Sequence, residues 1–161
     1  MLNKKFKSVT VNSVEGKVLS EISEREIDSL SDGDVTISVE YSCLNYKDAL
    51  AITGKGKIMR NFPCIAGIDL SGKVIESKSE NFKEGDKVVA TSYDIGVAHD
   101  GGLSEIARIP SEWIVKLPEN LTTKESMYYG TAGYTAALAI ERLENARLIK
   151  DSGKIIVNGS S

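Results

Sequence analysis

Four residues able to take part in chemistry stand together at positions 45–48, where the sequence reads Asn-Tyr-Lys-Asp. An amide and a phenol can each donate and accept hydrogen bonds, and a carboxylate can accept several. The same residue types also cap helices, and a short helix is predicted directly after them, over residues 49–53. We expect Asp48 to cap or orient the local backbone, and we keep Asn45 and Tyr46 as candidate site residues.

A further candidate is Thr131, which lies in Gly-Thr-Ala-Gly at positions 130–133, ahead of a long predicted helix. Its hydroxyl either caps that helix or bonds a ligand, and the two roles are compatible. Further on, residues 154–157 (Lys-Ile-Ile-Val) have the character of a buried strand that runs toward Gly159. A strand followed by a glycine turn and a helix would direct unpaired N–H groups at a pyrophosphate. The end of the chain therefore indicates the opening of a dinucleotide-binding domain.

Residues that bind metals or form disulfides are few. The one histidine, His99, stands beside Asp100 in a loop segment and is predicted to be solvated. The two cysteines, Cys43 and Cys64, lie in apolar surroundings. Buried free thiols are favoured over a disulfide, which a chain without a secretory signal seldom forms.

Length and charge limit the classes of function. With 161 residues the chain can bury a core, and its net charge of −3 is spread over interspersed acidic and basic residues. Because no basic stripe carries interleaved aromatic residues, a nucleic-acid partner is not expected. The longest apolar stretch, residues 132–140, is far shorter than a membrane span, and no apolar run follows the basic N-terminus. A cytoplasmic protein without a membrane partner is predicted.

The elements that would position the candidate residues change character near residue 118. Before it, short strands are separated by turns, and the clearest strand spans residues 34–41, where apolar and polar residues alternate. Together the strands suggest a small barrel or sandwich. They are predicted over residues 6–11 and 17–20 (as a hairpin), 34–41, 72–77, 86–91, 103–109 and 113–117.

After residue 118 the hydrophobic period becomes helical. Thr122 and Glu125 have the spacing of a capping box, so a short helix is predicted to begin there. Gly130 and Gly133 interrupt it, and a second helix is predicted from about residue 134 to residue 148. The predicted organisation is one domain over residues 1–121 and the beginning of a second over residues 122–161.

Five segments carry a resemblance to a known superfamily. They are Asn-Tyr-Lys-Asp at 45–48, Phe-Pro-Cys-Ile-Ala-Gly-Ile-Asp-Leu-Ser-Gly-Lys-Val at 62–74, Phe-Lys-Glu-Gly-Asp-Lys-Val at 82–88, Gly-Gly-Leu-Ser-Glu at 101–105 and Gly-Thr-Ala-Gly-Tyr-Thr-Ala at 130–136. In this order and spacing they resemble the medium-chain dehydrogenase/reductase superfamily, over essentially the whole chain. Residues 44–58 are similar to its zinc-free quinone-oxidoreductase-like branch, which includes NADPH-dependent acryloyl-CoA reductases.

The resemblance implies a mainly β GroES-like barrel over residues 1–121, which carries the substrate side of the cleft. A C-terminal helical segment and the first strand of an incomplete Rossmann α/β domain follow over residues 122–161. In this arrangement the strand at 154–157 would have little to pair with, so we expect it to be weakly anchored or to contact another molecule.

The resemblance also implies roles for individual residues. Tyr46 would lie in the cleft beside the nicotinamide of NADPH, and Asn45 would bond the ribose of the cofactor or the carbonyl of the substrate. These two are the candidate catalytic residues. Thr131 would face the nicotinamide, where its hydroxyl can bond the carboxamide, and Ser161 would lie at the start of the loop that approaches the pyrophosphate. Tyr46, Thr131 and Ser161 are thus the candidate cofactor contacts.

The resemblance further argues against zinc. Zinc-dependent members place a cysteine where Asn45 stands and a histidine where Ile68 stands, and neither residue is a good zinc ligand. No metal is predicted. Without a metal Lewis acid, reduction would be a direct hydride transfer to an electron-poor carbon, such as the activated C=C bond of an acryloyl-CoA-like 2-enoyl thioester, or to a quinone.

The predicted function is therefore an NADPH-dependent, zinc-free oxidoreductase with a small-molecule substrate. The choice of NADPH over NADH rests on the branch resemblance alone, because residues that would select the 2′-phosphate lie beyond Ser161. The 161-residue chain by itself is expected to be inactive, and a homodimer of a full-length enzyme is left open. The alternative hypothesis is a non-catalytic GroES-like binding or structural module.

Overall fold

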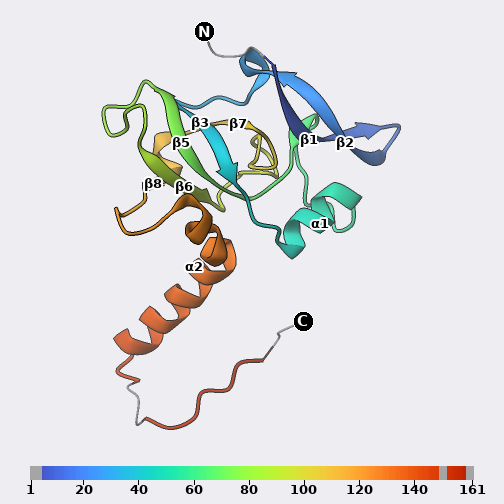
Figure 1. Ribbon diagram of the computed structural model, residues 1–161. Coiled ribbons are helices and arrows are strands. Elements are labelled where there is room, and N and C mark those ends of the chain that lie inside the picture. The colour runs from blue at the N-terminus through green and yellow to red at the C-terminus, as the bar shows by residue number, and fades with distance from the viewer. Residues whose placement is uncertain (1–4, 149–151, 159–161) are drawn as a thin grey trace.

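The computed structural model of the chain describes residues 5–148 and 152–158. Figure 1 shows a body built from two β-sheets, a short helix beside the smaller sheet and a long helix that leaves the body. The smaller sheet has the strand order β2-β1-β4 and the larger one β7-β3-β5-β6-β8. The elements are β1 (Lys5–Val14), β2 (Lys17–Glu26), β3 (Val35–Tyr41), α1 (Tyr46–Thr53), β4 (Cys64–Ile65), β5 (Asp69–Ser77), β6 (Lys87–Thr91), β7 (Ile106–Ile109), β8 (Ile114–Lys116) and α2 (Thr123–Asn145), with 3-10 turns at Ile27–Ser29 and Ser111–Trp113.

The N-terminal hairpin forms as predicted, with longer strands. β1 and β2 pair in antiparallel register from Lys5 opposite Glu26 to Val14 opposite Lys17. Both turn residues, Glu15 and Gly16, have positive φ angles, of 50° and 78°. That geometry matches the twist of the flanking strands, so the two-residue turn fixes their register.

The larger sheet holds the main core. β3 lies between β5 and β7, and its Val35 and Ile37 are completely buried. They pack with Leu70 and Val74 of β5 and with Ile109 of β7. The alternation of residues 34–41 predicted this buried face, and each of the strands predicted in residues 72–117 is present with small shifts at its ends.

A mainly β body is confirmed, but the strands of the described part do not close into a barrel. The larger sheet ends at β7 and β8, and the smaller one ends at β2 and β4. Because β4 has only two residues, it offers little backbone for bridging. The sheets instead meet through loop contacts, such as the bridge between Ser8 and Ser104 and the 2.8 Å bond from the Val9 amide to the Leu103 carbonyl.

The long helix α2 starts and bends where the sequence predicted. Thr122 and Glu125 form a capping box: the Thr122 hydroxyl accepts from the Glu125 amide at 3.1 Å, and the Glu125 carboxylate accepts from the Thr122 amide at 2.9 Å. Gly130 has non-helical angles (φ 48°, ψ −156°) and kinks the element there. The predicted gap up to residue 134 is wrong, however, because Gly133 lies within the second helical part, which ends at Asn145.

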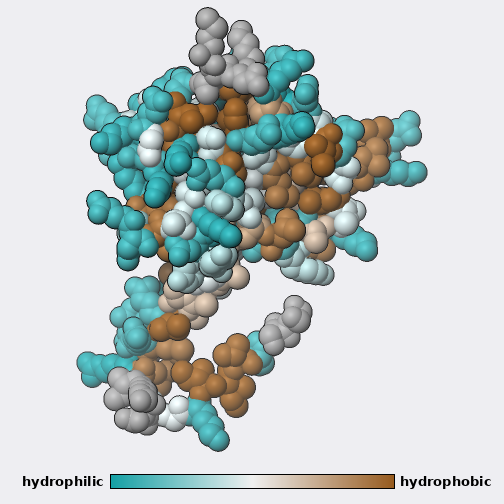
Figure 2. Space-filling view, in the orientation of Figure 1, coloured by the Kyte–Doolittle hydropathy of each residue, from teal (hydrophilic) through white to brown (hydrophobic). Residues whose placement is uncertain are grey.

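The second part of α2 extends away from the sheets, and residues 152–158 also lie apart from the sheets (Figure 1). No strand forms within residues 152–158; Ile156 is 89% and Val157 is 84% exposed. Figure 2 shows hydrophobic side chains gathered on this projecting region. The apolar run at 154–157 therefore pairs with no strand in the described part of the chain, in line with the expectation that it is weakly anchored. Ser161 lies outside the described residues.

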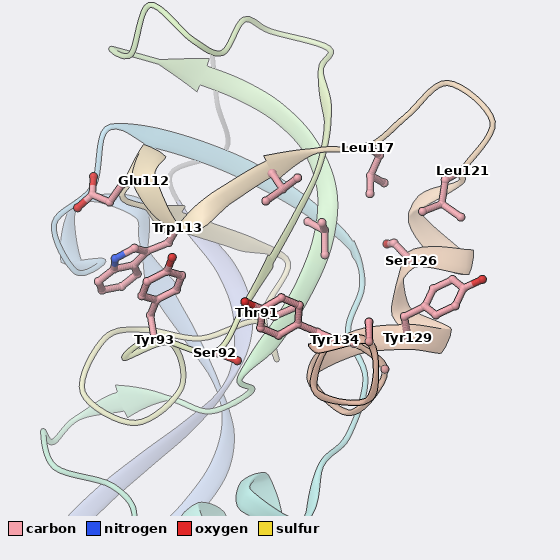
Figure 3. A pocket seen from close by; sticks show the side chains of 15 residues that line it. Thr91, Ser92, Tyr93, Glu112, Trp113, Leu117, Leu121, Ser126, Tyr129 and Tyr134 are labelled. Carbon is pink, nitrogen blue, oxygen red and sulfur yellow. The ribbon is translucent and has the colours of Figure 1, made fainter. Parts of the chain in front are cut away.

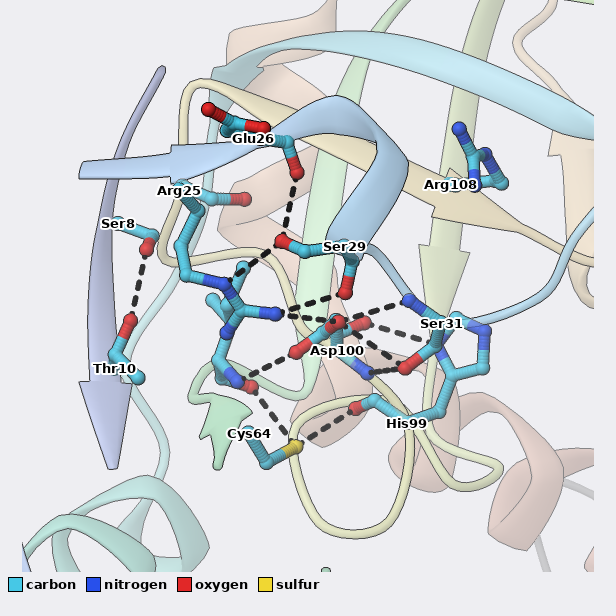
Figure 4. A network of polar contacts seen from close by, with 12 residues as sticks. Ser8, Thr10, Arg25, Glu26, Ser29, Ser31, Cys64, His99, Asp100 and Arg108 are labelled. Carbon is cyan, nitrogen blue, oxygen red and sulfur yellow. Dashed lines mark hydrogen bonds and ion pairs between the residues drawn. The ribbon is translucent and has the colours of Figure 1, made fainter. Parts of the chain in front are cut away.

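The prediction that His99 is solvated is wrong. Its side chain is buried, with Nε2 at 2.8 Å from the carbonyl of Asp32 and Nδ1 at 3.0 Å from that of Asp100. Trp113, distant in sequence, covers the imidazole edge-on. In Figure 4 the adjacent Asp100 carboxylate accepts hydrogen bonds from both the amide and the hydroxyl of Ser31 and from the amide of Ile65. Distant loops thereby bury a residue whose local sequence is polar.

Candidate functional site

A buried carboxylate, Asp69 at the start of β5, joins the candidate residues into one cluster. Asp69 is 0% exposed. Its Oδ2 accepts from the Cys43 thiol at 2.9 Å, from Asn45 Nδ2 at 2.8 Å and from the Thr131 amide at 2.9 Å. Its Oδ1 accepts from the Thr131 hydroxyl at 2.5 Å. Asp69, Cys43, Asn45 and Thr131 are called the Asp69 cluster below.

The kink at Gly130 brings Thr131 to Asp69. Because the helix is broken there, the Thr131 amide is free to donate to a carboxylate on β5 instead of to a carbonyl within the helix. A Cβ on residue 130 would lie 2.5 Å from Cys43 Sγ and 2.9 Å from Asp69 Oδ2. Gly130 therefore serves two purposes, since it supplies a positive φ angle and leaves room for the cluster.

Asn45 is held at the N-terminal end of α1 by its neighbour Asp48. The buried Asp48 carboxylate accepts from the Asn45 amide at 2.7 Å and from the Ile68 amide at 2.9 Å. The expectation that Asp48 orients local backbone is confirmed, and the second bond ties α1 to the segment that leads into β5. Asn45 and Asp69, 24 positions apart, are in this way fixed relative to each other.

Tyr46 is placed differently from the other candidates. It begins α1 and is 78% exposed, so it is not a core aromatic residue. The structure brings Asn45 and Thr131 together on Asp69, whereas Tyr46 lies on the surface next to Asn45 in the chain. The role proposed for Tyr46 stays a prediction.

An apolar cleft of about 720 Å³ lies next to the cluster, and Gly130 is one of the residues that line it (Figure 3). Ser92 connects the cleft to the cluster, since its hydroxyl lies 3.3 Å from that of Thr131. One wall carries the stacked rings of Tyr93 and Trp113, 5.2 Å apart. The lining includes Val89, Val115 and Leu117 of the body, and Tyr129, Tyr134 and Ala137 of α2.

Both cysteines are free, and both are poor nucleophiles. Burial and the hydrogen bond to the Asp69 carboxylate raise the pKa of Cys43 to about 12. Burial and the nearby charge of Asp100 raise the pKa of Cys64 to about 12 as well. At neutral pH the thiolate, which is the reactive form, is scarce at both positions. Cys43 therefore acts as a hydrogen-bond donor to Asp69.

Sequence reasoning missed Asp69, Cys43 and Ser92 as members of the site. A signal for Asp69 was present: it is the one charged residue in the stretch 62–72, which is otherwise apolar or small. An aspartate is seldom buried unless its charge is paired or hydrogen-bonded. Such a residue therefore marks a place where distant donors converge, although the sequence cannot say which donors they are.

Two kinds of feature are absent from the part of the chain that the structure describes. Among residues 5–148 and 152–158, no group of three or more His, Cys, Asp or Glu side chains is arranged to hold a metal ion. Within the same ranges, no helix combines the length and the apolar character needed to cross a membrane.

The fold and the site define a class of protein. Residues 31–119 match the model of the alcohol dehydrogenase GroES-like domain. The chain belongs to this family of the medium-chain dehydrogenases/reductases, as its five segments indicated.

Particular relatives make the comparison finer. The chain is 52% identical to Bacillus subtilis YhfP, named provisionally as a quinone oxidoreductase, over 79% of this chain and 38% of YhfP. A crystal structure of YhfP with NAD bound superposes with a TM-score of 0.88 at 44% identity, over 94% of this chain and 46% of that one. The chain is 41% identical to the acrylyl-CoA reductase AcuI of Ruegeria pomeroyi, over 97% of this chain and 48% of AcuI.

A crystal structure of the YhdH oxidoreductase from Salmonella enterica in complex with NADP is also similar. It has 45% identity and a TM-score of 0.85, over 88% of this chain and 44% of that one. The chain thus spans less than half the length of the relatives it matches.

Proposed function

We propose that this chain carries the substrate-side domain of an NADPH-dependent oxidoreductase that reduces an activated C=C bond or a quinone without a metal ion. The observation that carries the proposal is the Asp69 cluster, which unites Asn45 of the GroES-like part with Thr131 of the helix that follows it. Relatives named as an acrylyl-CoA reductase and as a quinone oxidoreductase support the substrate class, and a relative solved with NADP supports the cofactor.

The residue types at the site fit a reaction without zinc. Asn45 and Ile68 offer an amide and an alkyl chain, whereas zinc is bound by thiolate, imidazole or carboxylate. Cys43 lies beside Asn45, but its thiol donates its hydrogen bond to the Asp69 carboxylate, and among the described residues no third side chain of a metal-binding type joins the two. The neutral hydrogen-bonding groups of Asn45 and Thr131 suit a dinucleotide with amide and hydroxyl groups better than they suit a cation.

NADPH, when bound, supplies the hydride. The residues of the chain would then hold the reacting groups in place and exclude water, which is how a protein lowers the barrier of such a transfer. We assign Asn45 and Thr131 to the nicotinamide riboside and Tyr46 to the open side of the same site. Ser161 is assigned to the pyrophosphate, and residues 122–161 to the start of the dinucleotide-binding domain.

The test is an NADPH-oxidation assay on the complete reading frame that encodes this chain, with acryloyl-CoA, crotonyl-CoA and a quinone as acceptors. We expect oxidation of NADPH with at least one of them, at a rate that the chelator EDTA does not lower. A complete protein that binds NADPH but reduces none of the three would contradict the substrate class. Inhibition by EDTA that added zinc reverses would contradict the metal-free reaction.

The alternative, a non-catalytic binding module, is favoured by one observation, the apolar cleft of about 720 Å³ with exposed Tyr93 and Tyr129 at its walls. Calorimetric titration with NADPH separates the two functions. The complete protein should bind NADPH with micromolar affinity or better if it is a reductase. The 161-residue chain should bind it much more weakly, because half of the proposed dinucleotide site would be missing. No binding by either protein would favour the module.

A further inference from the structure

The Asp69 carboxylate determines which hydrogen-bonding groups the site has left for a ligand. An ionised carboxylate can only accept hydrogen bonds. The four hydrogen bonds to the Asp69 carboxylate come from the thiol of Cys43, the side-chain amide of Asn45, and both the main-chain amide and the hydroxyl of Thr131. Since Asp69 is completely buried, water cannot replace these donors without a loss of folding stability.

The side-chain amide of Asn45 is thereby fixed in one orientation. Its NH₂ group must face Asp69, because its carbonyl oxygen in that place would meet a carboxylate oxygen at 2.8 Å. The same NH₂ group is 3.8 Å from Cys43 Sγ, which takes up its second donor direction. The carbonyl oxygen of the half-buried Asn45 side chain accepts from the Asp48 main-chain amide in the capping box of α1. A carbonyl oxygen has two lone pairs, so what remains of this side chain for any other molecule is one acceptor position.

The hydroxyl proton of Thr131 is likewise fixed in one direction. A hydroxyl has one proton, and Thr131 donates it to Asp69 Oδ1 at 2.5 Å. The contact with Ser92 at 3.3 Å must then run from the Ser92 hydroxyl to Thr131 Oγ1. Like Asn45, Thr131 is left with lone pairs and no free proton.

We propose that Asp69 is a positioning residue that turns Asn45 and Thr131 into a pair of hydrogen-bond acceptors, so that the site recognises donor groups of its ligand. The inference rests on the proposed function, in which the donors are the carboxamide NH₂ and the ribose hydroxyls of the nicotinamide riboside. It assigns Asn45 to the cofactor: with no N–H to spare, Asn45 does not donate to the substrate carbonyl.

The test compares NADPH with its reduced 3-acetylpyridine analogue, whose acetyl group lacks the NH₂ donor. In the complete protein we expect Asp69→Asn to weaken NADPH binding about tenfold or more, because Asn45 and Thr131 lose their fixed orientation. Binding of the analogue should change far less. A purely structural role would weaken both ligands by the same factor, and that result would overturn the proposal.

Asp100→Asn is the matched control. Asp100 is also a buried carboxylate, and it accepts hydrogen bonds from Ser31 and Ile65 away from the cluster. This variant should lose stability and leave the ratio of NADPH affinity to analogue affinity unchanged. A changed ratio in this variant would show that the ratio reports stability, which would overturn the proposal too.

A second measurement needs no cofactor. In the 161-residue chain, the side-chain NH₂ protons of Asn45 should exchange slowly with solvent by NMR and rapidly after Asp69→Asn. Fast exchange in the unsubstituted chain would overturn the assigned orientation. If the complete protein binds no NADPH, the proposed function fails, and slow exchange would still establish that Asn45 offers an acceptor to some other donor.

Discussion

Asp69 and Thr131 are separated by 62 positions, and the carboxylate of the first accepts both the main-chain amide and the hydroxyl of the second, at 2.9 Å and 2.5 Å. The carboxylate thus caps the second part of α2 from a different element, at the kink made by Gly130. A negative charge at the N-terminal end of a helix is stabilised by the helix dipole and by the free N–H groups there. One residue of β5 therefore anchors the helix that leads out of the GroES-like domain.

The first prediction uses Cys43 as a reporter of the Asp69 charge. Burial is the largest cause of the high pKa of Cys43, and the hydrogen bond and charge of Asp69 raise it further. Replacing Asp69 by Asn removes the charge and should lower the pKa, so that more thiolate is present at a given pH. We expect alkylation of Cys43 by iodoacetamide at pH 8 to be about tenfold faster.

The measurement uses a Cys64→Ser background, so that only Cys43 reacts. Asp100→Asn in the same background is the control and should leave the Cys43 rate unchanged, because Asp100 raises the pKa of the other thiol. An equal acceleration in both variants would mean that general loosening of the fold, and not the Asp69 charge, controls the reaction.

The second prediction concerns Gly130. Gly130→Ala would force a Cβ to within 2.5 Å of Cys43 Sγ, at a φ angle of 48° and a ψ angle of −156° that side chains avoid. We expect a loss of about 2 to 3 kcal/mol in the free energy of unfolding, measured by urea denaturation. Gly85→Ala is the control, because Gly85 has a φ angle of 88° with nothing within 4 Å of the added Cβ. Its cost should be about 1 kcal/mol. Equal costs would mean that the cluster is not tightly packed.

The third prediction is a pH dependence that arises at Glu40. The Thr123 hydroxyl, at 2.6 Å, and the Lys73 ammonium, at 2.9 Å, lower the pKa of this carboxyl. A carboxyl whose pKa is lower in the folded state than in the unfolded state stabilises the fold at pH values above the unfolded pKa. This stabilisation is lost as the pH falls through the pKa of the folded state. Glu40 joins β3 to the first turn of α2, so this stabilisation holds the helix on the sheet.

Glu40→Gln should therefore lower the free energy of unfolding most at pH 7, and the difference from the unsubstituted chain should shrink as the pH is lowered toward 3. Urea denaturation at a series of pH values measures it. Glu84→Gln, in an exposed turn, is the control and should show no such trend. A difference that stays constant with pH would contradict the assignment of the effect to the Glu40 charge.

The parts of the fold that the sequence predicted depend on local chemistry. The alternation of residues 34–41 gave the buried face of β3, and the Thr122–Glu125 spacing gave the start of α2. The gathering of Asn45 and Thr131 on Asp69 could not be read in this way, because the three lie on different elements and are brought together by tertiary packing. His99 was misjudged for the same reason, since Trp113 and a distant carbonyl bury it.

The last prediction concerns association through residues 154–157. Ile156 and Val157 are 89% and 84% exposed, and the run Ile-Ile-Val is rich in β-branched residues without charge between them. Such a segment pairs readily with a second copy of itself, because in the described part of the chain its backbone belongs to no sheet or helix. We expect the 161-residue chain to self-associate with increasing concentration in analytical ultracentrifugation.

The substitution Ile156→Lys should suppress this association. It should leave the free energy of unfolding unchanged, because the Ile156 side chain makes little contact with the body. Lys154→Arg, which keeps the charge pattern, should associate as the unsubstituted chain does. Loss of stability in Ile156→Lys would instead show that the segment packs on its own chain in solution.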